Sequence, residues 1–76
     1  NYPVEDISEG FEKHFFSKRE REILCHLWEG RETKEIANLL FVSNDTVDTH
    51  RRNMLKKAEV TNTIALIRFA LSIGEL

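Results

Sequence analysis

The residues with the most evident chemistry lie in the stretch SNDTVDTHRRNMLKK, residues 43–57. Its charged side chains are two early carboxylates and four late cations: Asp45, Asp48, Arg51, Arg52, Lys56 and Lys57. Acids at the start of a helix and bases at its end complement the helix dipole, so the pattern suits a helix that is merely solvated. The same side chains also carry the acceptors and donors that pair with the edges of DNA bases. Both interpretations depend on where the side chains point.

Helical spacing divides this stretch into an apolar side and a polar side. Val47, Met54 and Ala58 share the apolar side. The outward residues are Asp45, Asp48, Thr49, Arg52 and Lys56. Arginine pairs with guanine, aspartate accepts from cytosine N4, and the threonine methyl contacts thymine, so this mixture suits base reading. The side chains that would instead meet phosphates, which position a protein without reading sequence, are Arg51, Lys56 and Lys57. From spacing alone, base reading and simple solvation both remain open.

The size and composition of the chain limit the classes of protein to consider. Its 76 residues predict one domain with a small core and no room for a deep catalytic cleft. A charged fraction of 32% and the lack of a long apolar run argue against a membrane protein. The net charge is −2, but the first twelve residues hold four acids and no Lys or Arg, which leaves nine acids and eleven bases in the rest. Charge alone therefore does not predict nucleic-acid binding.

Apolar residues recur at intervals of three and four, which predicts helices rather than strands. We expect an all-α fold of four helices that end at about Glu29, Leu40, Ala58 and Ile73. The expected N-caps are, in order, Ser17 in a capping box with Glu20, then Thr33, Ser43, and either Thr61 or Asn62. Gly30 suits the left-handed end of the first helix.

The second and third helices are joined by only three residues, Phe41-Val42-Ser43. Such a short turn forces the two helices to cross steeply, as they do in helix-turn-helix units. A steep crossing needs a small residue where the backbones approach and apolar anchors beside it. Ala37 and Val47 supply these ten residues apart, the spacing that helix-turn-helix units generally show.

Residues 1–14 contain Pro3, Gly10 and scattered acids without a period, so we expect a linker or leader from an absent N-terminal domain. Residues 15–76 are then the helix-turn-helix domain. The single cysteine, Cys25, cannot form an internal disulfide, which indicates a reducing compartment and a cytoplasmic protein. We expect the Cys25 side chain to be a small buried one.

The segment FSKREREILCHLWEGRETKEIANLLFVSNDTVDTHRRNMLKKAEV, residues 16–60, resembles the LuxR/FixJ-type (GerE-like) helix-turn-helix domain of bacterial transcription regulators. The family pattern has a Thr/Ser-x-Arg-Glu start, an aliphatic pair, a glycine, and then Lys-Glu-Ile-Ala and Thr-Val-x-x-His. The matching residues include Ser17, Arg19, Glu20, Ile23, Leu24, Gly30, Lys34, Glu35, Ile36, Ala37, Ser43, Thr46, Val47, His50, Asn53 and Met54. The resemblance covers residues 16 to about 70 and implies four helices with the third in the major groove.

The resemblance also implies roles for individual residues. Positions matching Asp48, Thr49 and Arg52 typically face bases in the family. Positions that lie near the DNA backbone match Thr33, Ser43, Thr46, Arg51 and Lys57. The chain departs from the pattern at Asp48, where lysine is common, and at Ala58, Glu59 and Thr63, which replace common Leu, Gly and Arg. An acid at position 48 costs non-specific affinity beside phosphates but can select cytosine.

Other residues could suggest a metal site or a catalytic site. Cys25 and His26 are adjacent on a helix and point about 100° apart, which is poor for shared ligation. His50 borders the apolar side, so either a structural role or a contact to a phosphate is open. No glycine-rich phosphate loop or pair of catalytic carboxylates is evident. We therefore predict no enzyme activity, no metal and no cofactor.

The fourth helix is apolar around most of its circumference. Leu66, Ile67 and Ala70 can face the core, which leaves an apolar strip partly exposed, and such strips mark contact surfaces. The resemblance suggests that this strip serves dimerisation on DNA, with an interface formed by Ala65, Phe69, Ser72 and Ile73. The alternative is that the leader or a missing domain covers it, through Phe11 or Phe15.

The combined interpretation is a sequence-specific DNA-binding output domain of a bacterial transcription regulator. Its expected partners are double-stranded DNA, a second copy of the chain and an upstream signal-input domain, with no membrane contact. The alternative is a helix-turn-helix fold used as a protein-interaction or dimerisation module. The slightly acidic balance and the apolar fourth helix keep that alternative open.

Overall fold

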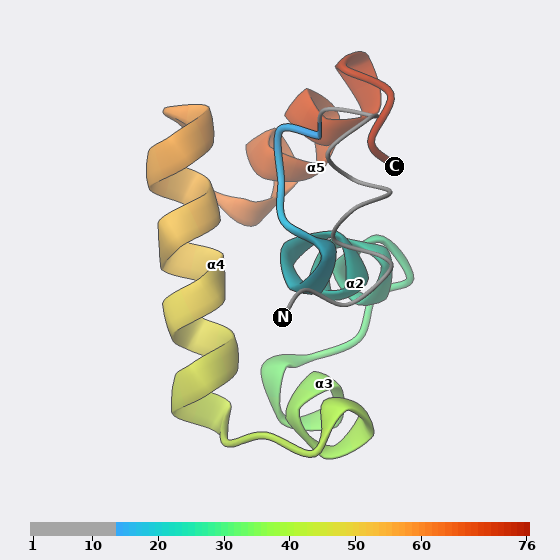
Figure 1. The fold of residues 1–76 in the computed structure, drawn as a ribbon, viewed down its shortest axis with the longest axis vertical. Helices are drawn as coiled ribbons and strands as arrows, with labels where there is room; N and C mark the ends of the chain where they lie inside the picture. The colour runs from blue at the N-terminus through green and yellow to red at the C-terminus, as the bar shows by residue number, and fades with distance from the viewer. Residues whose placement is uncertain (1–13) are drawn as a thin grey trace, which may run out of the picture.

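The computed structural model describes residues 14–76, and this part of the chain forms four helices and no strand (Figure 1). The helices are α2 (Lys18–Trp28), α3 (Thr33–Leu40), α4 (Asn44–Ala58) and α5 (Thr63–Ser72). The all-α prediction is confirmed. The leader predicted over residues 1–14 lies almost wholly outside the described residues, as does Phe11.

Three of the predicted N-caps are present. Ser17 and Glu20 form the capping box, with the Glu20 backbone N–H donating to Ser17 Oγ (3.2 Å) and the Ser17 N–H donating to Glu20 Oε1 (2.8 Å). Ser43 Oγ accepts from the Thr46 N–H (3.1 Å) at the start of α4. Asn62 Oδ1 accepts from the N–H of the third helical residue of α5 (2.8 Å), so Asn62 and not Thr61 is the cap.

The prediction that Thr33 caps α3 is wrong. The N-cap is Glu32, because the helical hydrogen bonds already begin at its carbonyl, which accepts from the Ile36 N–H (3.0 Å). Glu35 Oε1 accepts from the Glu32 N–H (3.2 Å). Thr33 is therefore the first helical residue, and its hydroxyl is not needed to begin the helix.

Helix α4 is the longest helix and runs alongside the other three (Figure 1). Its N-terminal half packs against α3, and the rest of its inner side packs against α2 and α5. One core joins all four helices, and its members are Phe16, Ile23, Leu24, Ile36, Ala37, Val47, Met54, Ala58, Leu66 and Ala70. Because α4 supplies three of these side chains from one side, its opposite side is left facing outward.

The α3–α4 connection has the predicted tight geometry. Phe41 ends α3 in the left-handed conformation (φ 59°), and the Val42 N–H donates to the Ala37 carbonyl (3.0 Å). Ala37 is 2% exposed and Val47 is 1% exposed, so both occupy the packed crossing as expected. This packing fixes the angle at which α4 leaves the turn.

The prediction that the Cys25 side chain is buried is wrong. Cys25 is exposed rather than buried, because Ile23, Leu24 and Leu27 form the buried stripe of the helix and Cys25 falls outside it. Trp28 follows on the same helix and is 55% exposed. Among residues 14–76, no helix is long and apolar enough to cross a membrane.

Candidate nucleic-acid interface

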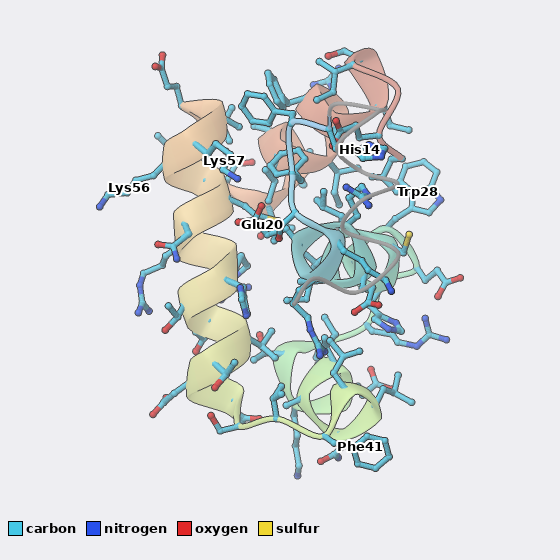
Figure 2. All side chains as sticks on the ribbon, viewed as in Figure 1. His14, Glu20, Trp28, Phe41, Lys56 and Lys57 are labelled. Carbon is cyan, nitrogen blue, oxygen red and sulfur yellow. The ribbon has the colours of Figure 1, made fainter. Side chains whose placement is uncertain are left out.

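The outward side of α4 presents the polar stripe that helical spacing predicts. Thr49, Arg52 and Lys56 are exposed, and the side chain of Asp48 is 36% exposed. Lys56 extends away from the body of the molecule (Figure 2). The structure therefore brings Asp48, Thr49 and Arg52 together on one accessible side of a helix whose opposite side is buried.

Two hydrogen bonds between neighbouring side chains fix how this stripe is oriented. Arg51 Nη2 donates to Asp48 Oδ1 (3.0 Å), and Arg52 Nη2 donates to Thr49 Oγ1 (3.3 Å). Both pairs join residues three apart on the helix, where side chains are neighbours. Only Asp48–Arg51 is an ion pair, and exposed ion pairs contribute about 0–1 kcal/mol to stability. The main consequence of the two pairs is that they orient these polar groups, and Arg51 also neutralises the Asp48 carboxylate locally.

Hydroxyl groups gather at the N-terminal end of α4. Ser43 Oγ and Thr46 Oγ1 lie 2.9 Å apart, beside the first turn of the helix. Thr33 lies in the first turn of α3 and is half-buried. Hydroxyls and free backbone N–H groups at helix N-termini suit anions such as phosphate.

Lys57 has a different environment from its neighbour Lys56. Its Nζ donates to Glu20 Oε1 (2.9 Å) and to the Phe15 carbonyl (3.3 Å). It also lies over the rings of Phe15 and Phe16, 5.9 and 5.8 Å from their centroids. Figure 2 shows Lys57 and Glu20 facing one another between α4 and α2. Lys57 thus anchors the C-terminal end of α4 to the rest of the domain.

Glu20 is the one charged residue that is buried among those described, at 7% exposed. Burial acts to raise the pKa of its carboxyl, but the hydrogen bonds from Lys57 and Ser17 outweigh burial and lower the pKa below its ordinary value. The carboxylate is therefore ionised at neutral pH and joins the start of α2 to the end of α4.

Sequence reasoning missed the contact between Glu20 and Lys57, which joins residues 37 apart in the chain. Glu20 was assigned only to the capping box, and Lys57 only to phosphate. The available signal was that both residues match the family pattern, Glu20 in its Thr/Ser-x-Arg-Glu start and Lys57 in an Asn-Met-x-x-Lys segment at residues 53–57. Lys57 has three N–H donors and uses two of them internally, so its predicted phosphate contact stays a prediction.

Comparison with known proteins decides the family. Residues 14–70 match the family described as "Bacterial regulatory proteins, luxR family" (GerE). The chain belongs to this family. It is a DNA-binding domain of a LuxR-type transcription regulator and not an enzyme. The predicted family and fold class are both confirmed.

Individual relatives agree with this assignment. The chain is 43% identical over 70 residues to the transcriptional regulatory protein MctR of Rhizobium johnstonii, covering 92% of this chain and 32% of MctR. It is 42% identical over 59 residues to the regulatory protein SdiA of Escherichia coli, covering 78% of this chain and 25% of SdiA. The structure of the transcription factor GerE superposes with a TM-score of 0.82 at 34% identity, covering 84% of this chain and 96% of GerE. The chain thus spans a third or less of these two curated relatives.

The apolar strip of α5 in this LuxR-family domain differs from the predicted one. Phe69 is half-buried because the rings of Phe15 and Phe16 pack against it, with centroids 5.1 and 6.1 Å away. Phe15 therefore covers part of the helix, as the alternative interpretation proposed. The exposed apolar residues of α5 and its C-cap are Ile64 (70%), Leu71 (42%) and Ile73 (41%). The sequence does not single out Ile64 and Leu71, because a helix that is apolar around most of its circumference does not show which side faces the core.

The C-terminal residues hold Phe15 and Phe16 in place. Gly74 adopts a left-handed conformation (φ 77°), which turns the chain back toward α5. The Glu75 carboxylate then accepts hydrogen bonds from the backbone N–H groups of Phe15 and Phe16. Of the other predicted interface residues, Ala65 is half-buried, and the Ser72 hydroxyl donates to the Phe69 carbonyl (2.7 Å).

The remaining candidate residues do not form a metal site. His50 is half-buried on α4, in keeping with its predicted place at the margin of the apolar side. Across residues 14–76, no three His, Cys, Asp or Glu side chains gather closely enough to hold a metal ion.

Proposed function

We propose that this LuxR-family domain binds double-stranded DNA in a sequence-specific manner, as a homodimer, with α4 in the major groove. The observation that carries the proposal is the contrast between the two sides of α4. One side is anchored by Val47, Met54 and the Lys57–Glu20 contact, and the other presents an exposed polar stripe. The major groove of B-DNA is about 12 Å wide and admits an α-helix.

Within the groove, Asp48, Thr49 and Arg52 contact base edges. Arg52 donates to guanine, Asp48 accepts from an exocyclic amine, and the Thr49 methyl meets thymine. The residues proposed to contact phosphates are Thr33, Ser43, Thr46, His50, Arg51, Lys56 and Lys57. They lie at both ends of α4, in its middle at His50 and Arg51, and at the start of α3. Phosphate contacts at several points along a helix would hold it in the groove.

Two domains are proposed to pair through α5, at Ala65, Phe69, Ser72 and Ile73. Ile64 and Leu71 are also exposed on α5, but helical spacing places them on a different side of the helix from Phe69. Such a dimer reads two half-sites about one helical turn apart, so an operator with two-fold symmetry is expected. The regulator as a whole is proposed to be cytoplasmic, with a signal-input domain upstream and residues 1–14 as the connection.

A selection from random duplexes tests this function. The domain is incubated with the pool at low salt, and the enriched sequences are measured again at higher salt. Enrichment of an inverted repeat, with affinity that falls steeply with salt, is the expected result. If neither the domain nor a version fused to a dimeriser enriches any sequence, the proposal of base reading is wrong.

The substitution Arg52→Ala tests the proposed contact between Arg52 and a base. It is expected to weaken binding by about 1–3 kcal/mol and to relax specificity at one position of each half-site. The matched control is Arg68→Ala, which removes an exposed arginine from α5. The control should leave base preference unchanged at every position, and equal effects of the two variants would contradict a base contact by Arg52.

A further inference from the structure

The ion pair between Asp48 and Arg51 stands in the middle of the exposed stripe on α4. Arg51 Nη2 lies 3.0 Å from Asp48 Oδ1, and the two side chains are 34% and 36% exposed. A lone carboxylate that enters a DNA groove meets the repulsion of the phosphates on both strands. The pair with Arg51 has no net charge, so it can approach DNA without that penalty.

We propose that Asp48 and Arg51 act as one unit that selects a cytosine in each half-site, with Asp48 as the reader and Arg51 as its positioning residue. The proposal rests on the function proposed above, because it requires α4 to lie in the major groove. It goes further by assigning a base to a position where the family commonly carries lysine, whose ammonium group can only donate hydrogen bonds.

The chemistry of the groove leads to cytosine. An ionised carboxylate only accepts hydrogen bonds, so Asp48 needs a base that donates. In the major groove the donors are cytosine N4 and adenine N6. Adenine places its N7 acceptor beside N6, and that lone pair repels a carboxylate. Cytosine has no acceptor beside N4 in the groove, so cytosine is the base that an aspartate favours.

The hydrogen-bonded pair of Thr49 and Arg52 predicts how far the cytosine lies from a second base. Arg52 is held beside Thr49 by a 3.3 Å hydrogen bond and offers only donors, which suits guanine O6 and N7. Asp48 and Arg52 are four residues apart, a rise of about 6 Å along the helix. Base pairs are stacked about 3.4 Å apart. The cytosine and the guanine should therefore lie within about two base pairs of one another, on either strand.

Arg51 can hold Asp48 and contact DNA at the same time. A guanidinium has five N–H donors in a planar fork, and the pair uses the Nη2 group. The remaining donors are available to a phosphate. This arrangement reconciles the contact with Asp48 with the phosphate contact proposed for Arg51.

The first experiment repeats the duplex selection with Asp48→Asn. The two side chains have the same shape, but an asparagine amide both accepts and donates and pairs with adenine N6 and N7. The starting domain should prefer cytosine at one position of the half-site by about 5- to 150-fold. In the variant, the preference at that position should move to adenine. The matched control is Asp45→Asn, which removes the same charge from an exposed residue of the first turn and should change no preference.

The second experiment is a double-mutant cycle on the selected duplex. Arg51→Gln should lower affinity by a larger factor in the starting domain than in the D48N variant, because only the starting domain leaves an unpaired acid in the groove. Urea unfolding of all variants checks that they fold. Equal factors in the two backgrounds would show that the residues do not act as a unit.

The outcomes separate this inference from the function on which it rests. If D48N and the starting domain select the same sequence, Asp48 does not read a base, although the domain still binds DNA specifically. If D45N changes base preference as much as D48N does, the effect is one of charge, and the inference is again overturned. If no protein enriches any sequence, both the proposed function and this inference are wrong.

Discussion

Lys56 and Lys57 are neighbours on α4 and both are exposed, yet their surroundings differ. Lys56 extends into solvent from the outward stripe (Figure 2). Lys57 is held by the Glu20 carboxylate, by the Phe15 carbonyl and by two aromatic rings. The 100° step between consecutive helical residues produces this difference. A cationic side chain near DNA is therefore not evidence of a DNA contact until its internal partners are known.

The same contrast extends to the whole helix. Substitutions on the anchored side should change the free energy of unfolding, whereas substitutions on the stripe should change DNA binding and leave stability nearly unaffected. Four predictions test this division between the anchored side and the exposed side of α4, the largest expected effect first.

Glu20→Ala should have the largest effect on stability. It removes the acceptor for the Ser17 N–H and for Lys57, and it leaves that cation without its carboxylate. Hydrogen bonds to charged groups contribute about 1.5–3 kcal/mol, and the partial exposure of Lys57 screens part of this, so a loss of about 2 kcal/mol is expected. Urea unfolding measures it.

The control for this variant is Glu22→Ala on the same helix. Glu22 is half-exposed and pairs with Arg19 at 3.6 Å, so its loss should cost no more than about 0.5 kcal/mol. If the two variants were equally stable, Glu20 would not be the anchor of α4.

Lowering the pH should reduce the contribution of Glu20 to the free energy of unfolding. Because the pKa of Glu20 is lowered on folding, its contribution to stability is fully present above the ordinary glutamate pKa of about 4.3. That contribution is lost as the pH falls through the lower pKa of the folded state. The stability difference between the starting domain and Glu20→Gln should therefore shrink between pH 7 and pH 3. Urea unfolding across this range measures the stability difference. A difference that increased in acid would contradict the predicted direction.

Lys57→Gln and Lys56→Gln compare the two neighbours directly. Lys57→Gln should lower the free energy of unfolding by about 1 kcal/mol because it breaks a partly screened ion pair. Lys56→Gln should change it by less than about 0.5 kcal/mol. If both residues reach phosphates as proposed, each variant should reduce the slope of log affinity against log salt by about one. Equal stability of the two variants would break the division between the sides of α4.

Local structure was predictable because its causes lie within a few residues. The caps at Ser17, Ser43 and Asn62 each bond a backbone N–H three residues ahead. The stripe on α4 follows from helical periodicity, and the crossing at Ala37 and Val47 follows from the three-residue turn. The cap at Thr33 was wrong because Glu32, one residue earlier, already occupies that role.

Contacts between distant residues were not predictable from patterns of this kind. The Glu75 carboxylate meets backbone N–H groups 59 and 60 residues earlier, and any segment can offer such groups. Those bonds bring Phe15 onto Phe69, which changes the apolar area that α5 exposes. Asp48 and Arg51 are close in sequence, but i,i+3 spacing alone did not show that they pair rather than reach outward separately.

Phe41→Gly should have the smallest effect and the opposite sign. Phe41 is 93% exposed and has a left-handed backbone (φ 59°), a conformation that strains a residue with a Cβ atom. Glycine relieves that strain but gains freedom in the unfolded chain, so a net stabilisation of about 0.5 kcal/mol is expected. The control Phe41→Ala removes the same ring and keeps the strain, and it should leave stability unchanged. Differential scanning calorimetry can compare both variants with the starting domain. A loss of stability in Phe41→Ala would mean that the ring packs against the domain in solution, and the division between anchored and exposed residues would then fail at the turn that positions α4.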